Sequence, residues 1–477
     1  MSGPLILRNV EVEGRAGLDV RVEDGRIAAI GPRLQRDGAR DLDAAGGALI
    51  PGLIDHHIHL LALAAEAQSV SLADARDPAE VATRLRAATA ARPGGAWIRA
   101  TGYHEAGAPL LDAADLDAIA PSHPVRVQHR SGVLWVLNGP ALREALGGDP
   151  PPDCVERDAA GRPTGRVWRG DAWLAARLGR TPPPLAPIGR ALAACGITAV
   201  TDASATTDAW AAALLAAAHA AGDLPQRLTL MSAGPLTPPA GAAVGPVKIL
   251  LDDERLPDFD EMLTRIAAAR AWGRAVAVHC VTASELAITL AALDASGARP
   301  GDRIEHGSVI PQDAIPVIRD LGLTVVTQPG FVRTRGDRYL AEVDPTEHAD
   351  LYRLRSLKTA TVPLAASSDA PYGRPDPWEA IFATVDRRTR DGRPLGASET
   401  LAAREALDLW LGDPRDPGGP PRRVAVGAPA DLCLLDRPLA AALTAPSAER
   451  VAATIISGRV VHAADAPAAS LTEEAGA

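Results

Sequence analysis

The sequence predicts an α/β protein: a distorted (β/α)8 TIM barrel, with a small β-sandwich formed by both chain termini and an inserted α+β subdomain. Three observations support this prediction. Short apolar runs alternate with Ala/Leu-rich stretches through the middle of the chain. Polar residues that follow these runs recur at the spacing of a barrel. Short strand-like segments with turn signals lie near both ends of the chain.

The apolar runs in the middle of the chain number eight, which is the strand count of a closed barrel. Each is short and bounded by turn residues, as expected for buried parallel strands. Helical patterns fill the gaps between them, for example at 259–272 and 284–296. The eight predicted strands are 49–60, 196–204, 226–233, 247–252, 275–280, 302–308, 323–328 and 363–369.

The spacing of the polar residues favours one barrel. A barrel of about 250 residues allots roughly 31 residues to each βα unit. His279 follows Lys248 by 31 positions and His306 follows His279 by 27, while Asp369 follows after 63, about two units. The interval between His59 and the second predicted strand is far too long for one unit. We therefore expect an insertion after the first strand.

The insertion carries strand-like segments of its own at 96–104 and 124–136. The segments at the two chain ends mix β-branched residues with turns such as Glu23-Asp-Gly25, and we interpret them as one sandwich. The expected organisation is a β-sandwich from 1–50 and 415–465, a barrel from 51–61 and 181–414, an inserted subdomain at 62–180, and a disordered tail at 466–477.

The composition is that of a soluble globular protein, with 47% hydrophobic and 23% charged residues. A net charge of −10 argues against a nucleic-acid or anionic-membrane partner. The four cysteines are far apart, which favours reduced thiols and a cytoplasmic location. No secretory signal or membrane span is visible. We expect a small-molecule substrate, and a homodimer remains open as the assembly.

The segment Asp55-His-His-Ile-His59 is the first candidate for metal binding. On a strand, Asp55, His57 and His59 project to one face and His56 to the other. Two imidazoles at i and i+2 can chelate one cation. Taken alone, this pattern is a weak signal, because histidines satisfied by hydrogen bonds are commoner than ligands. The interpretation gains support because His279, His306 and Asp369 also end predicted strands, and strand ends converge at the barrel mouth.

Lys248 is unusual in this chain. Lysine and arginine total 49, of which two are lysine and 47 arginine. Lys248 lies in the apolar run GPVKILLD, where a solvated charge has no evident role. Lysine can lose its proton in a buried site, and guanidinium cannot. The alternative is a lysine that reaches solvent or pairs with Asp252 or Asp253.

These motifs in this order resemble the metal site of the amidohydrolase superfamily. The resemblance rests on PGLIDHHIHL, VKILLD, AVHC, IEHGS and SSDAP, with VEDGRIAAIGP and GAPADLCLLD in the flanks. The segments GYHEAG, LDAADLDAIAPSHPV, LWVLN and GRPTG are similar to the amidohydrolase-3 branch, which includes N-substituted formamide deformylases. The resemblance spans nearly the whole chain.

The resemblance implies a centre of two divalent metal ions, for which imidazole and carboxylate ligands favour Zn2+. It also implies that Lys248 bridges the ions as a carbamate derived from CO2. A metal-bridging hydroxide would attack the substrate, with Asp369 as the catalytic proton shuttle. The implied ligands are His57, His59 and Asp369 for the more buried ion, His279 and His306 for the second, and Lys248 for both.

Candidate substrate-binding residues lie in the insertion and in a predicted loop after the seventh strand, QPGFVRTRGDRY. An arginine here could clamp a carboxylate, although solvated loop charges are commoner. One departure from the branch pattern is Val133, which follows Gly132 where relatives often carry histidine, so their substrates do not transfer. The candidates are Tyr103, His104, His129, Arg130 and Trp135 in the insertion, and Gln328, Arg333 and Arg335 in the loop.

We therefore expect a metal-dependent hydrolase that cleaves a C–N bond in an amide, an N-acyl or N-formyl amine, a urea or a cyclic amide. One alternative is a mononuclear deaminase of the same superfamily, in which Lys248 has no metal role. A further alternative, from another functional class, is a catalytically silent relative that serves as a scaffold. Such relatives tend to lose ligands, and all six ligand positions are filled here.

Overall fold

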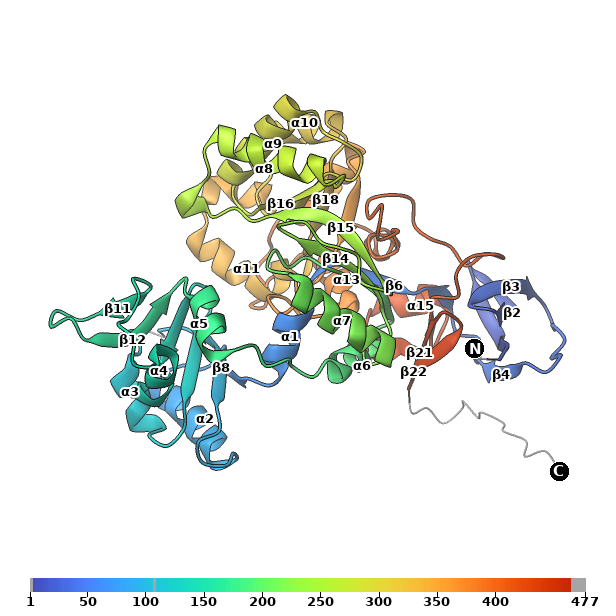
Figure 1. The fold of residues 1–477 in the computed structure, drawn as a ribbon. Coiled ribbons are helices and arrows are strands. Elements are labelled where there is room, and N and C mark those ends of the chain that lie inside the picture. The colour runs from blue at the N-terminus through green and yellow to red at the C-terminus, as the bar shows by residue number, and fades with distance from the viewer. Residues whose placement is uncertain (1–2, 106–108, 465–477) are drawn as a thin grey trace. The chain divides into compact units, whose positions relative to one another are not determined.

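The computed structural model describes residues 3–105 and 109–464 of the chain. Contacts divide the chain into two compact units, which are described separately (Figure 1). The first unit comprises Met1–Leu60 and Leu185–Ala477, and the second comprises Leu61–Pro184. The tail at 466–477, which we predicted to be disordered, lies outside the described residues.

The first unit is built around an eight-stranded parallel sheet that nearly closes into a barrel. Its strands follow chain order from β6 to β19, and each pairs with the next. The last strand meets the first through the loop after β19, where the Asp369 amide donates to the His57 carbonyl at 2.8 Å. The strands are β6 (Leu53–Ile58), β13 (Ile197–Asp202), β14 (Arg227–Ser232), β15 (Ala242–Ile249), β16 (Val276–Cys280), β17 (Arg303–His306), β18 (Thr324–Thr327) and β19 (Leu364–Ala366).

All eight predicted barrel strands are present, so the predicted fold class is confirmed. The strands read as continuous apolar runs because both faces are buried, one by the barrel interior and one by helices. The helices that alternate with them are visible around the sheet in Figure 1. They are α6 (Ala186–Ala194), α7 (Ala209–Ala221), α8 (Phe259–Ala271), α9 (Ala283–Ser296), α10 (Ala314–Asp320), α11 (Gly330–Glu342), α12 (Arg355–Thr359), α13 (Pro377–Asp386) and α14 (Ala403–Asp408).

Helix starts follow local capping chemistry. Asp258 caps α8 by accepting from the Glu261 amide at 2.8 Å. Thr282 and Glu285 form a reciprocal capping box at the start of α9. These caps explain why the patterns at 259–272 and 284–296 predicted the two helices to within a residue or so.

Several local predictions differ from the structure. The predicted strand 49–60 is two strands, β5 (Leu49–Pro51), which joins a sheet of the chain ends, and β6 of the barrel. The fourth strand spans Ala242–Ile249 and begins five residues before the predicted start, because Ala242–Val244 pair with Leu228–Leu230 of β14. Gly245 and Pro246 lie within this strand, and Arg274 donates to both of their carbonyls at 2.8 Å. The predicted loop QPGFVRTRGDRY is also wrong, since most of it forms helix α11.

The chain ends form two four-stranded sheets that share one hydrophobic core. Val10 and Val20 of one sheet and Leu432 and Ile455 of the other belong to the same buried cluster. The first sheet has the order β3-β2-β1-β4 and the second β22-β21-β20-β5. The strands are β1 (Leu5–Val12), β2 (Arg15–Glu23), β3 (Arg26–Gly31), β4 (Arg40–Asp43), β5 (Leu49–Pro51), β20 (Leu432–Leu435), β21 (Val451–Ile456) and β22 (Arg459–Ala463); helix α15 (Leu439–Thr444) follows β20.

The second unit is a six-stranded sheet with helices on both faces. Alternate residues of β10 pack in two different hydrophobic clusters, one on each face of the sheet. Val136 belongs to one cluster, and Trp135 and Leu137 belong to the other. The strand order is β11-β12-β10-β9-β8-β7. Its elements are β7 (Val70–Ser71), β8 (Ile98–Tyr103), β9 (Val125–His129), β10 (Leu134–Leu137), β11 (Val155–Arg157), β12 (Pro163–Trp168), α2 (Pro78–Ala90), α3 (Ala113–Ile119), α4 (Gly139–Leu146) and α5 (Asp171–Leu178); α1 (Leu60–Ala67) spans the junction.

The predicted strand piece at 124–136 is two antiparallel strands, β9 and β10, joined by a turn. Gly132 has a φ of 77° and donates its amide to the His129 carbonyl at 2.9 Å. This conformation favours glycine, and it allows the chain to reverse. Val133 therefore lies at the end of a hairpin turn.

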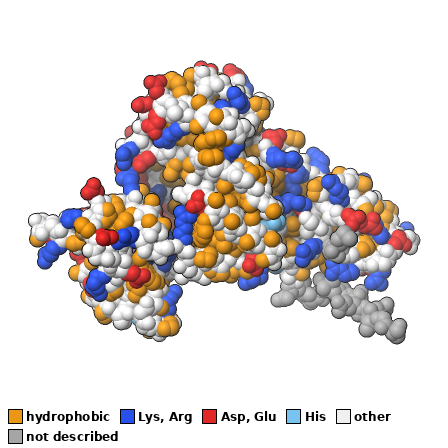
Figure 2. Space-filling view, in the orientation of Figure 1, with side chains coloured by type: hydrophobic (Ala, Val, Ile, Leu, Met, Phe, Trp, Pro, Cys, Tyr) orange, Lys and Arg blue, Asp and Glu red, His pale blue; other side chains and the backbone are white. Residues whose placement is uncertain are grey.

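Charges of both signs are spread over the face of the molecule in Figure 2, in keeping with the mixed acidic and basic composition. Among the described residues, no helix has the length and apolar character required to cross a membrane.

Candidate metal centre

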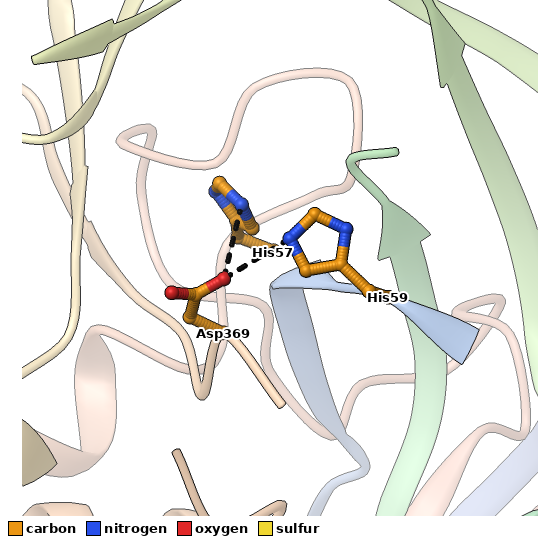
Figure 3. Close-up of side chains that lie close together, drawn as sticks. All are labelled: His57, His59 and Asp369. Carbon is orange, nitrogen blue, oxygen red and sulfur yellow. Dashed lines mark hydrogen bonds and ion pairs between the residues drawn. The ribbon is translucent and has the colours of Figure 1, made fainter. Parts of the chain in front are cut away.

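His57, His59 and Asp369 form a compact group of possible metal ligands (Figure 3). One ligand atom from each lies within 4.8 Å of the others. Asp369 Oδ1 lies 3.4 Å from His57 Nε2 and 3.1 Å from His59 Nε2. His57 Nε2 makes no hydrogen bond within the described part of the chain. An imidazole lone pair beside a carboxylate, with no donor to satisfy it, fits a cation.

The alternation on β6 accounts for the first two ligands. Asp55 and His57 are both completely buried, and the His57 amide donates to Asp55 Oδ1 at 3.2 Å. Asp55 also accepts from the Ser368 amide at 3.0 Å and from the Ser368 hydroxyl. It therefore ties the first barrel strand to the segment that carries Asp369. Burial raises the pKa of Asp55 to about 6.

His279 and His306 extend the group along the strand ends. The ring centroids of His306 and His57 are 4.8 Å apart, and those of His279 and His306 are 4.5 Å apart. Strict alternation on β17 would turn His306 away from its neighbour Glu305. Instead His306 has a φ of 70°, a left-handed conformation that is unusual for histidine. This turn lets both Glu305 and His306 approach His57.

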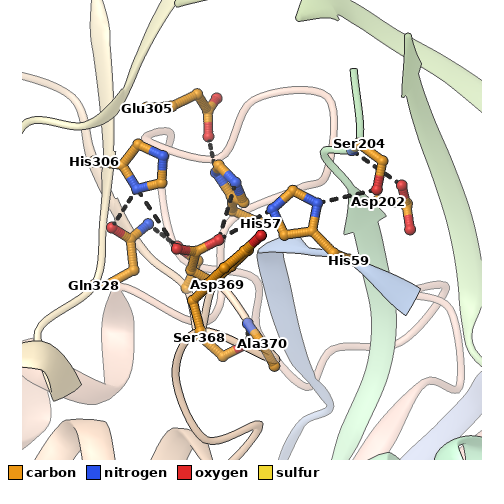
Figure 4. A network of polar contacts seen from close by, with 12 residues as sticks. His57, His59, Asp202, Ser204, Glu305, His306, Gln328, Ser368, Asp369 and Ala370 are labelled. Atoms are coloured by element: carbon orange, nitrogen blue, oxygen red, sulfur yellow. Dashed lines mark hydrogen bonds and ion pairs between the residues drawn. The ribbon is translucent and has the colours of Figure 1, made fainter. Parts of the chain in front are cut away.

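Three of the four histidines have one ring nitrogen held by a neighbour (Figure 4). Metal-binding imidazoles usually have their second nitrogen anchored in this way. His57 Nδ1 contacts the Glu305 carboxylate, His59 Nδ1 lies 3.0 Å from Ser204 Oγ, and His306 Nδ1 lies 2.9 Å from Gln328 Oε1. His57 Nε2 makes no hydrogen bond among the described residues, and His59 Nε2 faces Asp369 Oδ1 at 3.1 Å.

Three histidines of the group, His57, His279 and His306, have a pKa below the usual value, which favours the neutral imidazole. Burial lowers the pKa of His57 and His306 well below the usual value. Burial and then Lys248 lower the pKa of His279 to about 3. A neutral imidazole has the free lone pair that metal binding requires.

Lys248 is only 3% exposed, and its amine makes no hydrogen bond within the described residues. It lies one residue before the end of β15, in register with Ala277, which is two residues before His279 on β16. Burial lowers the pKa of Lys248, which favours the neutral amine. The alternative of a solvent-reaching lysine paired with Asp252 or Asp253 does not fit this burial.

The turn after β19 positions Asp369. Asp369 lies three residues beyond the strand and has a φ of 54°. Its carbonyl accepts from the Tyr372 amide at 2.8 Å, and the Tyr372 carbonyl accepts from Arg335 Nη2 at 2.6 Å. The Arg335 guanidinium lies 3.8 Å from the Phe331 ring centroid. The Tyr372 ring is edge-on to His59, with centroids 5.8 Å apart.

The candidate substrate residues after the seventh strand already have partners inside the protein. Gln328 is buried between His306 and the Ser367 hydroxyl. Arg335 binds the turn after Asp369, and Arg333 lies 3.9 Å from Asp386. These contacts indicate that Gln328 and Arg335 hold the site in place; their contact with substrate stays a prediction.

The candidates in the insertion belong to the second unit, and the structure shows their contacts there. The Tyr103 hydroxyl accepts from the Leu111 amide at 3.0 Å. Trp135 Nε1 donates to Asp171 at 2.8 Å, and His129 Nε2 lies 3.2 Å from Glu105. The Arg130 amide donates to the Tyr103 carbonyl, and Arg130 is exposed, whereas His104 is partly buried. Their role in substrate binding stays a prediction.

The sequence analysis did not identify Glu305, Ser204 and Asp202. Ser204 anchors His59, and Asp202 accepts from the Ser204 and Leu60 amides at 3.1 and 2.8 Å. Each of these residues lies at or near the end of a barrel strand, which was the only signal available. The partner histidines lie more than a hundred positions away in the sequence.

A barrel that carries a His-His-Asp group at its strand ends has the fold and site of a metal-dependent hydrolase. The chain belongs to the amidohydrolase family, whose model matches residues 41–462, within its amidohydrolase-3 branch. It is 26% identical to N-substituted formamide deformylase of Arthrobacter pascens, with 90% of this chain and 92% of that protein covered. The resemblance stated above is thereby confirmed.

Two solved structures share the fold. An uncharacterized metal-dependent hydrolase from Pyrococcus horikoshii OT3 has a TM-score of 0.75 at 18% identity, covering 96% of this chain and all of that one. Another from Pyrococcus furiosus has a TM-score of 0.71 at 20% identity, covering 91% and 99%. At these identities the similarity supports the fold.

Proposed function

We propose that this protein hydrolyses a C–N bond of a small molecule with the help of two Zn2+ ions. The observation that carries the proposal is the convergence of His57, His59 and Asp369 next to a buried amine, Lys248, that has no hydrogen-bond partner among the described residues. Neutral imidazoles and a carboxylate form a donor set suited to Zn2+.

The donor set divides between two ions. The first three ligands form one group, and the two further histidines lie beside it. A carboxylate on a long side chain is needed to join two cations. The proposed ligands are His57, His59 and Asp369 for one ion, His279 and His306 for the other, and a carbamate on Lys248 for both.

Lys248 suits carbamate formation. A neutral amine attacks CO2, the N–C bond forms, and one proton leaves, so the product is a carbamate anion. Burial disfavours the charged ammonium form at Lys248, and the nearby ions would favour the anion. Arginine offers no equivalent chemistry, because its guanidinium keeps its proton.

Asp369 is the proposed proton carrier. When bound, the metal ions would acidify water and polarise the substrate carbonyl. Asp369 accepts a proton from the attacking water at a carboxylate oxygen and then delivers it to the leaving nitrogen. The turn that binds its main chain to His57 and Tyr372 keeps this carboxylate beside the two histidines.

Similarity to relatives suggests the general class of substrate to test, a compound with a hydrolysable C–N bond. The similarity to N-substituted formamide deformylase makes an N-formyl amine the first compound to test. Amides, N-acyl amines, ureas and cyclic amides complete the panel. Val133 at the hairpin turn is the reason to test the panel broadly.

The test is elemental analysis of wild type and Lys248→Arg, combined with hydrolysis of the panel. We expect two zinc ions per chain and activity in the wild type, and loss of both in the arginine variant. Retention of two ions and of activity by Lys248→Arg would contradict the carbamate. One ion per chain, with activity that survives Lys248→Ala, would instead favour the mononuclear deaminase. A protein that binds no divalent metal would favour the scaffold alternative.

A further inference from the structure

A buried ion pair lies directly behind His57. Glu305 and Arg303 are two residues apart on β17, so both side chains project to the same face of the strand. One Glu305 oxygen contacts His57 Nδ1, and the other accepts from Arg303 Nε. Arg303 Nη2 also donates to the His56 carbonyl at 3.1 Å. The pair therefore connects the sixth barrel strand to the first through the barrel interior.

This ion pair is costly to bury. The side chain of Glu305 is 0% exposed and that of Arg303 is 2% exposed. Desolvation of two such charges often outweighs their mutual attraction, and apolar residues of similar volume are often equally stable or more so. Stability of the barrel alone therefore gives a weak reason for two charges at this place. A role towards His57 gives a stronger one.

The chemistry of the three anchoring groups differs. The Ser204 hydroxyl can donate or accept, and the Gln328 amide can present either its oxygen or its nitrogen. The Ser204 hydroxyl is compatible with either tautomer of His59, whereas the Gln328 amide donates to Ser367 Oγ and so turns its oxygen towards His306 Nδ1. An ionised Glu305 can only accept, so the nitrogen of His57 that faces it must carry the proton. Among the described anchors, Glu305 is the only carboxylate, and Arg303 holds it in place.

We propose that Glu305 is a positioning residue that keeps His57 protonated at Nδ1 and leaves the Nε2 lone pair directed at the metal site, and that Arg303 holds Glu305 in that orientation. This inference rests on the proposed metal-dependent function. Its consequence is that the affinity for metal depends on a residue that does not itself bind the ion.

The test compares Glu305→Gln with Asp302→Asn. The glutamine keeps the size of the side chain, but its amide cannot serve both His57 Nδ1 and Arg303 as an acceptor. Asp302 is a matched control, since it is also fully buried and pairs with Arg270, and it contacts none of the proposed ligands. Both changes disturb a buried ion pair of the same barrel, so any general cost to folding is shared.

Two measurements are made on each protein. Zinc affinity by competition with a chelating dye should fall about 10- to 100-fold in Glu305→Gln and stay within about twofold of wild type in Asp302→Asn. Nitrogen NMR of 15N-histidine in the metal-free protein should show His57, assigned from the signal lost in His57→Ala, as the Nδ1–H form in wild type. That signal should change in Glu305→Gln only.

The double variant Arg303→Met/Glu305→Leu separates positioning from folding. It replaces the ion pair by apolar residues, so its melting temperature should equal or exceed that of metal-free wild type while its zinc affinity falls. Wild-type affinity in Glu305→Gln, or an equal loss in Asp302→Asn, would overturn the inference and leave the proposed function intact. A wild type that binds no zinc would overturn the proposed function itself.

Discussion

Replacing Lys248 by methionine should make the metal-free protein more stable. The methionine side chain has a similar length and needs no hydrogen bond, whereas the Lys248 amine is buried without a partner among the described residues. An unsatisfied buried polar group costs about 1–3 kcal/mol. For a unit of roughly 350 residues, this corresponds to a rise of about 1–4 °C in the melting temperature.

The assay is thermal unfolding of metal-free protein, followed by calorimetry. Lys358→Met is a matched control, because Lys358 is the second lysine of the chain and lies at the surface, 3.7 Å from Glu405. Its replacement should change stability by less than about 0.5 kcal/mol. A metal-free Lys248→Met protein that melts below wild type would refute the reasoning, since it would mean that the amine has a stabilising partner.

The stability gained by replacing Lys248 with methionine should also depend on pH. Because burial lowers the pKa of Lys248, the unfolded chain binds a proton at this site that the folded protein lacks. The wild type therefore gains stability as pH rises towards 10.5, the usual value for lysine, and the advantage of Lys248→Met narrows. With metal and 13C-labelled bicarbonate present, the order of stability reverses, and wild type should be more stable than Lys248→Met. One 13C carbamate signal should appear in wild type and in Lys358→Met, and it should be absent from Lys248→Met. The two proteins that give the signal should also be stabilised more by zinc.

Three further predictions concern the same site. Asp369→Asn should lower kcat by about 100- to 10,000-fold, measured on the best substrate of the panel; near-normal kcat would exclude the proton-carrier role. Arg335→Met should lose the bond to the Tyr372 carbonyl and lower kcat/KM by up to about tenfold for neutral substrates and carboxylates alike, whereas Arg338→Met on the same helix should have little effect. A loss confined to carboxylate substrates would instead show that Arg335 clamps them. Removal of metal by a chelator should lower the melting temperature, and zinc at 100 times its Kd should restore about 2.7 kcal/mol; an unchanged melting curve would contradict metal binding.

Much of the barrel could be predicted because its information is local. Each strand is an apolar run of a few residues, and the spacing of about 30 residues follows from one strand and one helix per unit. Prediction failed where distant contacts outweighed local preference. The start of β15 at Ala242 depends on pairing with Leu228 of β14, a contact that the local sequence does not show. The apparent loop after Gln328 is a helix that carries Arg335 to Tyr372.

The candidate ligands could be named because their residue types are rare and suited to metal binding. Two histidines at i and i+2, one lysine in an apolar strand and one aspartate after the last strand are distinctive in a linear sequence. The residues that support these ligands are not distinctive in the linear sequence. Glu305 is one of 59 acidic residues, and nothing in the sequence around it shows that it contacts His57, 248 positions away.

The sequence by itself determined the order of the strands, the face of β6 on which His57 lies, and the chemical identity of the donors. These follow from residue type and from a period of two along a strand. Tertiary structure alone decided how the donors are held. The left-handed conformation of His306, the turn at Asp369 and the contact of Glu305 with His57 each join segments far apart in the chain. Barrel closure brings those segments together, and local backbone preferences do not indicate which segments will meet.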